Sequence, residues 1–114
     1  MNKRLAIIAL ALAPWATGCG PDCQSTCQRI YGDAPNCDHN SPGETREELL
    51  SQCEDHCKSA LEHPGPVGNY KPSERTATPE STVLETDKQA ALWMDCVAET
   101  SCEHLEDGYC APIF

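Results

Sequence analysis

Apolar residues recur at the spacing of an α-helix in three stretches of the chain, and no stretch alternates convincingly as a strand does. The first such helix is expected to start at Pro21 and Asp22, because proline suits the first turn and an acid suits the positive end of the helix dipole. Gly32 is expected to cap its C-terminal end. One face of this helix carries Cys23, Cys27, Ile30 and Tyr31, at positions i, i+4, i+7 and i+8.

The second helix begins near Ser41 or Thr45, since either residue forms a capping pattern with a glutamate three positions later. It ends at His63-Pro64, because the residue before a proline disfavours helical angles. Its apolar stripe consists of Leu49, Leu50, Cys53, Cys57, Ala60 and Leu61.

A third helix opens at Thr86, where Gln89 completes a capping box, and ends at Thr100-Ser101. Trp93, with Met94, is expected to belong to its core and not to a ligand platform. Its apolar side carries Ala90, Trp93, Cys96 and Val97, and a last turn from Cys102 to Gly108 leads to Cys110 and an apolar tail.

These patterns predict a small, disulfide-rich, all-α domain. Residues 23–63 form an antiparallel helical hairpin, and residues 86–114 form the third helix with a cysteine-rich C-terminal segment. Between them, residues 64–85 are rich in proline and polar residues and predict a flexible, irregular linker with little core.

The first 18 residues are typical of a signal peptide. Lys3 and Arg4 precede an apolar run, residues 5–13, which is too short for the roughly 20 residues that span a bilayer. Pro14 and small residues then lead to Cys19. The alternative is a buried N-terminal core helix, although such helices rarely start at the first methionine behind two cations.

The sequence Ala16-Thr17-Gly18-Cys19 resembles the lipobox of bacterial lipoproteins. The resemblance implies that Cys19 is the lipidated first residue of the mature protein, held to a membrane, with residues 19–22 as anchor and short spacer. The family prefers leucine at the place of Ala16, so an ordinary signal peptidase could cut here too and leave Cys19 unmodified. Lipidation leaves eight of the nine cysteines, an even number that can pair completely. By the same resemblance, Gly20 favours the outer over the inner membrane of a Gram-negative envelope.

The net charge of residues 19–114, the part expected to be exported, restricts which partners it can bind. Without Lys3 and Arg4, six basic residues remain against 18 acidic ones, and the net charge moves from -10 to -12. Such a surface repels nucleic acid, which needs Lys and Arg at its phosphates. A protein or glycan partner in the envelope fits this composition better.

Eight cysteines must supply much of the stability, because few aliphatic side chains follow Cys19. In Cys23-x-x-x-Cys27 and Cys53-x-x-x-Cys57 the paired residues lie one turn apart on one helix face. If the two helices are antiparallel, the bridges are Cys23–Cys57 and Cys27–Cys53. A four-thiolate zinc site is the alternative, which an oxidising compartment disfavours.

This twin motif looks like the disulfide-stapled helical hairpins of plant α-hairpinins and of the small Tim chaperones of mitochondria. The resemblance covers residues 23–57 and concerns the fold, since these families do unrelated jobs. Of the other cysteines, Cys102 and Cys110 are close enough in sequence to bridge, which leaves Cys37 for Cys96. Other pairings remain open.

Neither the Cys-x-x-Cys-His motif of haem attachment nor the Cys-x-x-Cys motif of redox proteins occurs, and residues 33–44 lack the ligands of an EF-hand. No nucleophile elbow is present, so we expect neither an enzyme nor a bound cofactor. Two classes of function remain: an envelope-anchored structural or interaction module, and a metal- or cation-binding lipoprotein. The second would use carboxylates and the surface histidines His39, His56, His63 and His104.

Overall fold

The computed structural model describes residues 20–114, which form an all-helical domain without strands in that range. Its elements are α1 (Cys23–Tyr31), α2 (Arg46–Leu61), the 3-10 turn η2 (Pro79–Ser81), α3 (Asp87–Glu99) and α4 (Cys102–Glu106). The expected signal peptide and Cys19 lie outside the described residues. The all-α, disulfide-rich fold class is confirmed.

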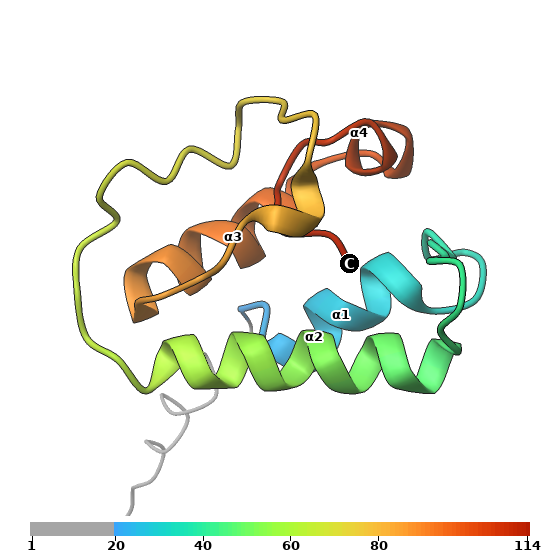
Figure 1. The fold of residues 1–114 in the computed structure, drawn as a ribbon, viewed down its shortest axis with the longest axis horizontal. Helices are drawn as coiled ribbons and strands as arrows, with labels where there is room; N and C mark the ends of the chain where they lie inside the picture. The colour runs from blue at the N-terminus through green and yellow to red at the C-terminus, as the bar shows by residue number, and fades with distance from the viewer. Residues whose placement is uncertain (1–19) are drawn as a thin grey trace, which may run out of the picture.

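Helices α1, α2 and α3 each contact the other two, so the three share one core (Figure 1). Helices α1 and α2 run antiparallel as a hairpin. Helix α3 crosses above them, and the segment between α2 and α3 arches around the outside of the molecule (Figure 1). Helix α4 lies on the side of the molecule away from α2, and the chain end then returns toward α1 (Figure 1).

Side-chain caps fix the start of each long helix. Asp22 caps α1, because its carboxylate accepts a hydrogen bond from the Ser25 amide at 2.7 Å. Of the two expected starts for α2, the structure has Thr45, whose hydroxyl accepts from the Glu48 amide at 3.1 Å while the Glu48 carboxylate accepts from the Thr45 amide. At α3 the Thr86 hydroxyl accepts from the Gln89 amide.

The core is small and contains much sulfur. Cys27, Cys53 and Cys57 are wholly buried beside Ile30 and Val97, so disulfides occupy space that a larger domain fills with aliphatic side chains. The central residue is Trp93, which is 1% exposed. Its indole N–H donates to the carbonyls of Cys110 and Pro112 at 3.0 and 3.2 Å. Trp93 is therefore a core residue, as expected from the sequence.

One member of the expected apolar stripe of α2 lies outside the core. Leu61 is 42% exposed. Helix α2 is longer than α1 and continues one turn beyond Cys57, the last residue bridged to α1, so α1 does not cover its final turn.

The segment 64–85 contributes more to the fold than its composition predicts. It is irregular apart from η2, yet Pro72 and Leu84 are buried. Its backbone is also joined to the C-terminal segment, because the Pro72 carbonyl accepts from the Cys110 amide at 2.8 Å and the Thr76 amide donates to the Gly108 carbonyl at 3.0 Å. These bonds hold the segment beside α3 and α4.

Candidate binding groove

Two disulfides connect the hairpin. Cys23 bridges Cys57 and Cys27 bridges Cys53, with Cα–Cα distances of 5.7 and 5.9 Å. This is the pairing expected for antiparallel helices that carry two cysteines one turn apart. The coarse likeness to a disulfide-stapled helical hairpin therefore holds for the described part of the chain.

The expected pairing of the other four cysteines is wrong. Cys37 bridges Cys102, and Cys96 bridges Cys110. Closeness in sequence misled the prediction, because helix α4 starts at Cys102 and separates it from Cys110. The turn at Gly108 then folds the chain back, and the contact between Trp93 and the Cys110 carbonyl holds Cys110 beside α3.

The four bridges use all eight cysteines of residues 20–114. None of these eight is left to pair with Cys19 within the same molecule.

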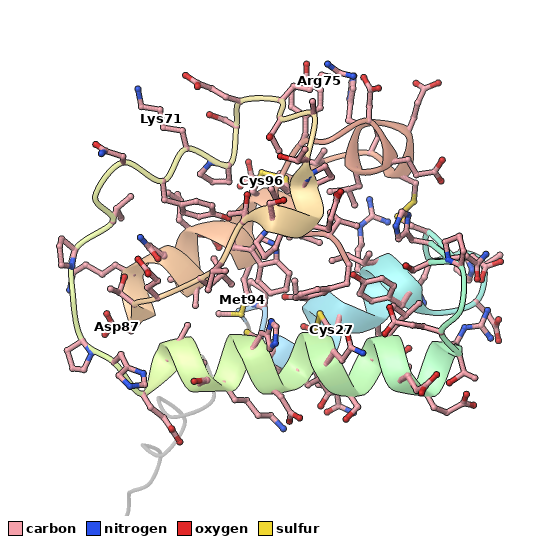
Figure 2. The ribbon with its side chains drawn as sticks, viewed as in Figure 1. Cys27, Lys71, Arg75, Asp87, Met94 and Cys96 are labelled. Atoms are coloured by element: carbon pink, nitrogen blue, oxygen red, sulfur yellow. A yellow bond between two sulfur atoms is a disulfide. The ribbon has the colours of Figure 1, made fainter. Side chains whose placement is uncertain are left out.

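An open groove of about 970 Å³ lies on the outer side of α3. One wall is residues 70–73 of the arching segment, which enter a turn at Pro72, and the other is formed by α3, the start of α4 and Tyr109. Cys96 also lines it, so the disulfide to Cys110 fixes α3 to the segment that carries Tyr109. In Figure 2, Cys96 lies beside the arching segment, far from the hairpin cysteine Cys27.

The α3 side of the groove carries an apolar and two acidic side chains. Leu92, Asp95 and Glu99 all line it, at the i, i+3 and i+7 positions of one helix face. Leu92 is 38% exposed, which places a large aliphatic side chain in contact with water. This face is the opposite of the core face that carries Trp93.

Two tyrosines, Tyr70 and Tyr109, line the groove, one in each wall. The Tyr70 hydroxyl donates to the Ala111 carbonyl, which holds the ring against the C-terminal segment. Burial raises the pKa of Tyr70, so its phenol remains neutral. The ring of Tyr109 meets His104 edge to face, at 5.2 Å between centroids. Ser101 lies 3.1 Å from the His104 Nδ1 and so orients that imidazole.

The basic residues nearest the groove differ in their contacts. Arg75 forms an ion pair with Asp107, at 3.4 Å. Lys71 lines the groove, is exposed, and points outward from the arching segment (Figure 2). Lys71 is therefore the one Lys or Arg among the lining residues, which also include the acidic pair Asp95 and Glu99.

The histidines proposed as metal ligands are spread over the domain. His39 packs on Tyr31, His56 on Phe114, and His104 on Tyr109. Across residues 20–114, no three His, Cys, Asp or Glu side chains are grouped so that they could share a metal ion. The same part of the chain contains no helix long and apolar enough to cross a bilayer.

Sequence reasoning did not identify the groove. Its second wall comes from residues 70–73, which composition assigned to a linker. One signal was present: Leu92 falls outside the apolar stripe of the third helix, next to Asp95, and so places an aliphatic side chain on the polar face.

No protein-family model, curated protein or solved structure matches this chain.

Proposed function

We propose that this chain is an exported, lipid-anchored protein whose disulfide-locked helical domain binds a protein partner in the envelope through the groove beside α3. Cys19 is its anchor to the membrane, and outer-membrane sorting is favoured by Gly20. The observation that carries the binding role is the groove, whose lining combines water-exposed Leu92 with two tyrosines and two carboxylates.

Export and anchoring are supported by the cysteines. Four disulfides are typical of an oxidising compartment outside the cytosol. Since the eight cysteines of residues 20–114 pair with one another, the ninth is available for another chemistry, and it stands in the lipobox-like sequence. Only Gly20, Pro21 and Asp22 separate Cys19 from α1, a stretch of about 13 Å when extended at roughly 3.3 Å per residue. The domain would then sit directly on the membrane.

Fractionation tests the anchor. We expect Cys19→Ser to move the protein from the membrane to the soluble fraction, and mass spectrometry of the wild-type N-terminal peptide to show acyl chains on Cys19. Ala16→Leu serves as the matched control, because it improves the lipobox and should leave the protein acylated. An unmodified Cys19 in the wild type refutes the anchor.

Site-specific photo-crosslinking in intact cells tests the binding role. A photoreactive amino acid at Leu92 should give a crosslink to one identifiable envelope protein, and the same amino acid at exposed Ser51 on α2 should not. Equal crosslinking from the two positions would show random collisions, and no crosslink at Leu92 would refute a partner in the groove.

A further inference from the structure

We infer that the groove beside α3 receives an arginine side chain from an extended segment of the partner protein. The inference rests on the proposed binding function and adds the chemistry of the partner. Its elements are two carboxylates one turn apart, an exposed aliphatic side chain on the same helix face, and two tyrosines in the lining.

The carboxylates define the charge of the ligand. Asp95 and Glu99 are at positions i and i+4 of α3, where Cβ atoms lie about 5–6 Å apart on one face. A planar guanidinium presents several N–H donors in a fixed fork, so it can donate to both carboxylates at once. A single ammonium is a point charge and fits such a separated pair less well.

The remaining lining fits the other parts of an arginine. Its three-methylene stem can lie along Leu92, which is 38% exposed and would lose water contact. The guanidinium plane can stack on the face of a tyrosine ring, an attraction that acts within about 6 Å of the ring centre. Tyr70 suits this role because its hydroxyl is held by the Ala111 carbonyl and its phenol stays neutral.

Two features of the groove distinguish Asp95 and Glu99 from the other acidic residues of the domain. Every helical element of residues 20–114 except α1 carries acidic residues, but of these acids it is Asp95 and Glu99 that line a groove together with Leu92 and Tyr70. Lys71 stands at the same groove and repels an incoming cation. Removing Lys71 should therefore strengthen binding, whereas removing the carboxylates should weaken it.

Titration by nuclear magnetic resonance tests the inference on the full chain, oxidised, ¹⁵N-labelled and held in neutral detergent micelles. The probe is the capped tripeptide acetyl-Gly-Arg-Gly-amide. The control peptide has citrulline in place of arginine, because citrulline has nearly the shape of arginine without its charge. We expect the arginine peptide to shift the amides of residues 70–73, 92–99 and 109, and to bind at least about fivefold more tightly than the citrulline peptide.

Variants assign the effect to the groove. Asp95→Asn with Glu99→Gln should weaken the arginine peptide about fivefold or more, and Lys71→Ala should tighten it. The matched control is Asp55→Asn with Glu62→Gln, which removes the same two charges from exposed positions on and after α2 and should leave the affinity unchanged. Wild-type dispersion of the other amides shows that each variant is folded.

Two results overturn the inference: equal affinity for the arginine and citrulline peptides, or equal loss in the groove and control variants. If either result were found together with a specific crosslink at Leu92, the proposed binding function would remain supported, but the partner would not bind through an arginine. Absence of that crosslink, with arginine binding intact, would instead refute the protein partner.

Discussion

Glycine at position 108 is required for two physical reasons. Its φ of 106° lies in a region that residues with a Cβ rarely adopt, and a Cβ there would overlap the Thr76 carbonyl oxygen. Thr76 is also the residue whose amide donates a hydrogen bond to the Gly108 carbonyl. A single glycine thus allows the C-terminal turn and the arching segment to approach each other.

Gly68 provides the comparison for a mutational test, because it also has a positive φ, 65°, but open space where a Cβ would stand. We expect Gly68→Ala to lower the free energy of unfolding by about 1 kcal/mol, the cost of the backbone angle alone. Gly108→Ala should cost about 3 kcal/mol, since the overlap with Thr76 adds to the angle. Thermal or urea unfolding measures both, and equal losses would show that the approach of the two backbones is loose.

Buried phenols predict a loss of stability in alkali. Burial raises the pKa of Tyr31 and of Tyr70 above the ordinary value of 10.0. The folded state therefore holds these protons after the unfolded chain has released them, so the free energy of unfolding is undiminished below pH 10 and falls as the pH rises above it.

The Tyr31→Phe, Tyr70→Phe double variant should lose part of this alkaline slope. It should also be less stable at neutral pH by roughly 1 kcal/mol for each hydrogen bond removed, which are those to the Phe114 amide and the Ala111 carbonyl. Urea unfolding between pH 8.5 and 11 gives the slopes. If the free energy of unfolding fell with pH as steeply in the variant as in the wild type, groups other than these two phenols would cause the loss of stability in alkali.

The helices could be predicted from the sequence because their signals are local. Asp22, Thr45 and Thr86 are caps that act on amides three residues away, so a short stretch of sequence contains both partners. The twin cysteine motif extends the same logic to a pair of helices. The helix faces were also assigned correctly, except at Leu61, where the length of the neighbouring helix decided exposure.

The cap of α2 permits a test at the level of the element. Thr45→Ala removes the hydroxyl that accepts from the Glu48 amide and should lower the free energy of unfolding by about 1 kcal/mol. Ser51→Ala, an exposed position within the same helix, should be neutral or slightly stabilising because alanine favours helix. Chemical unfolding compares the two, and an unaffected Thr45→Ala variant would mean that α2 is held by its disulfides alone.

The groove and two disulfides depended on long-range contacts, which the sequence does not encode locally. Stretch 70–73 is held in place by hydrogen bonds from the Cys110 amide to the Pro72 carbonyl and from the Tyr70 hydroxyl to the Ala111 carbonyl. The partner of Cys37 is Cys102, which lies 65 residues away along the chain at the start of α4, so no local pattern predicts the pair. Composition alone identified residues 64–85 as irregular but not as a wall of a binding surface.

At the scale of the molecule, the small core makes the fold dependent on its bridges. Each disulfide contributes about 2–4 kcal/mol by restricting the unfolded chain. Full reduction should therefore abolish cooperative thermal unfolding and most of the helical circular dichroism. A reduced domain that still melted cooperatively would show that the apolar core suffices.

Peptide mapping under non-reducing conditions tests the connectivity. We expect one linked peptide pair containing Cys37 and Cys102, and another containing Cys96 and Cys110. Detection of Cys102 joined to Cys110 would contradict the position of α4.

The order of the bridges along the chain has a consequence for processing by proteases. The two hairpin bridges lie wholly within residues 23–57, and the bridge from Cys96 to Cys110 lies wholly within the C-terminal part. Of the four disulfides, the bridge between Cys37 and Cys102 is the one that joins these two parts, which are otherwise linked covalently by the backbone. A cut anywhere between residues 58 and 95 would thus convert the protein into a two-chain molecule with a single covalent connection. The portion bearing α3 would stay attached to an anchored hairpin after such a cut, and reduction of that one bond would remove its last covalent tie.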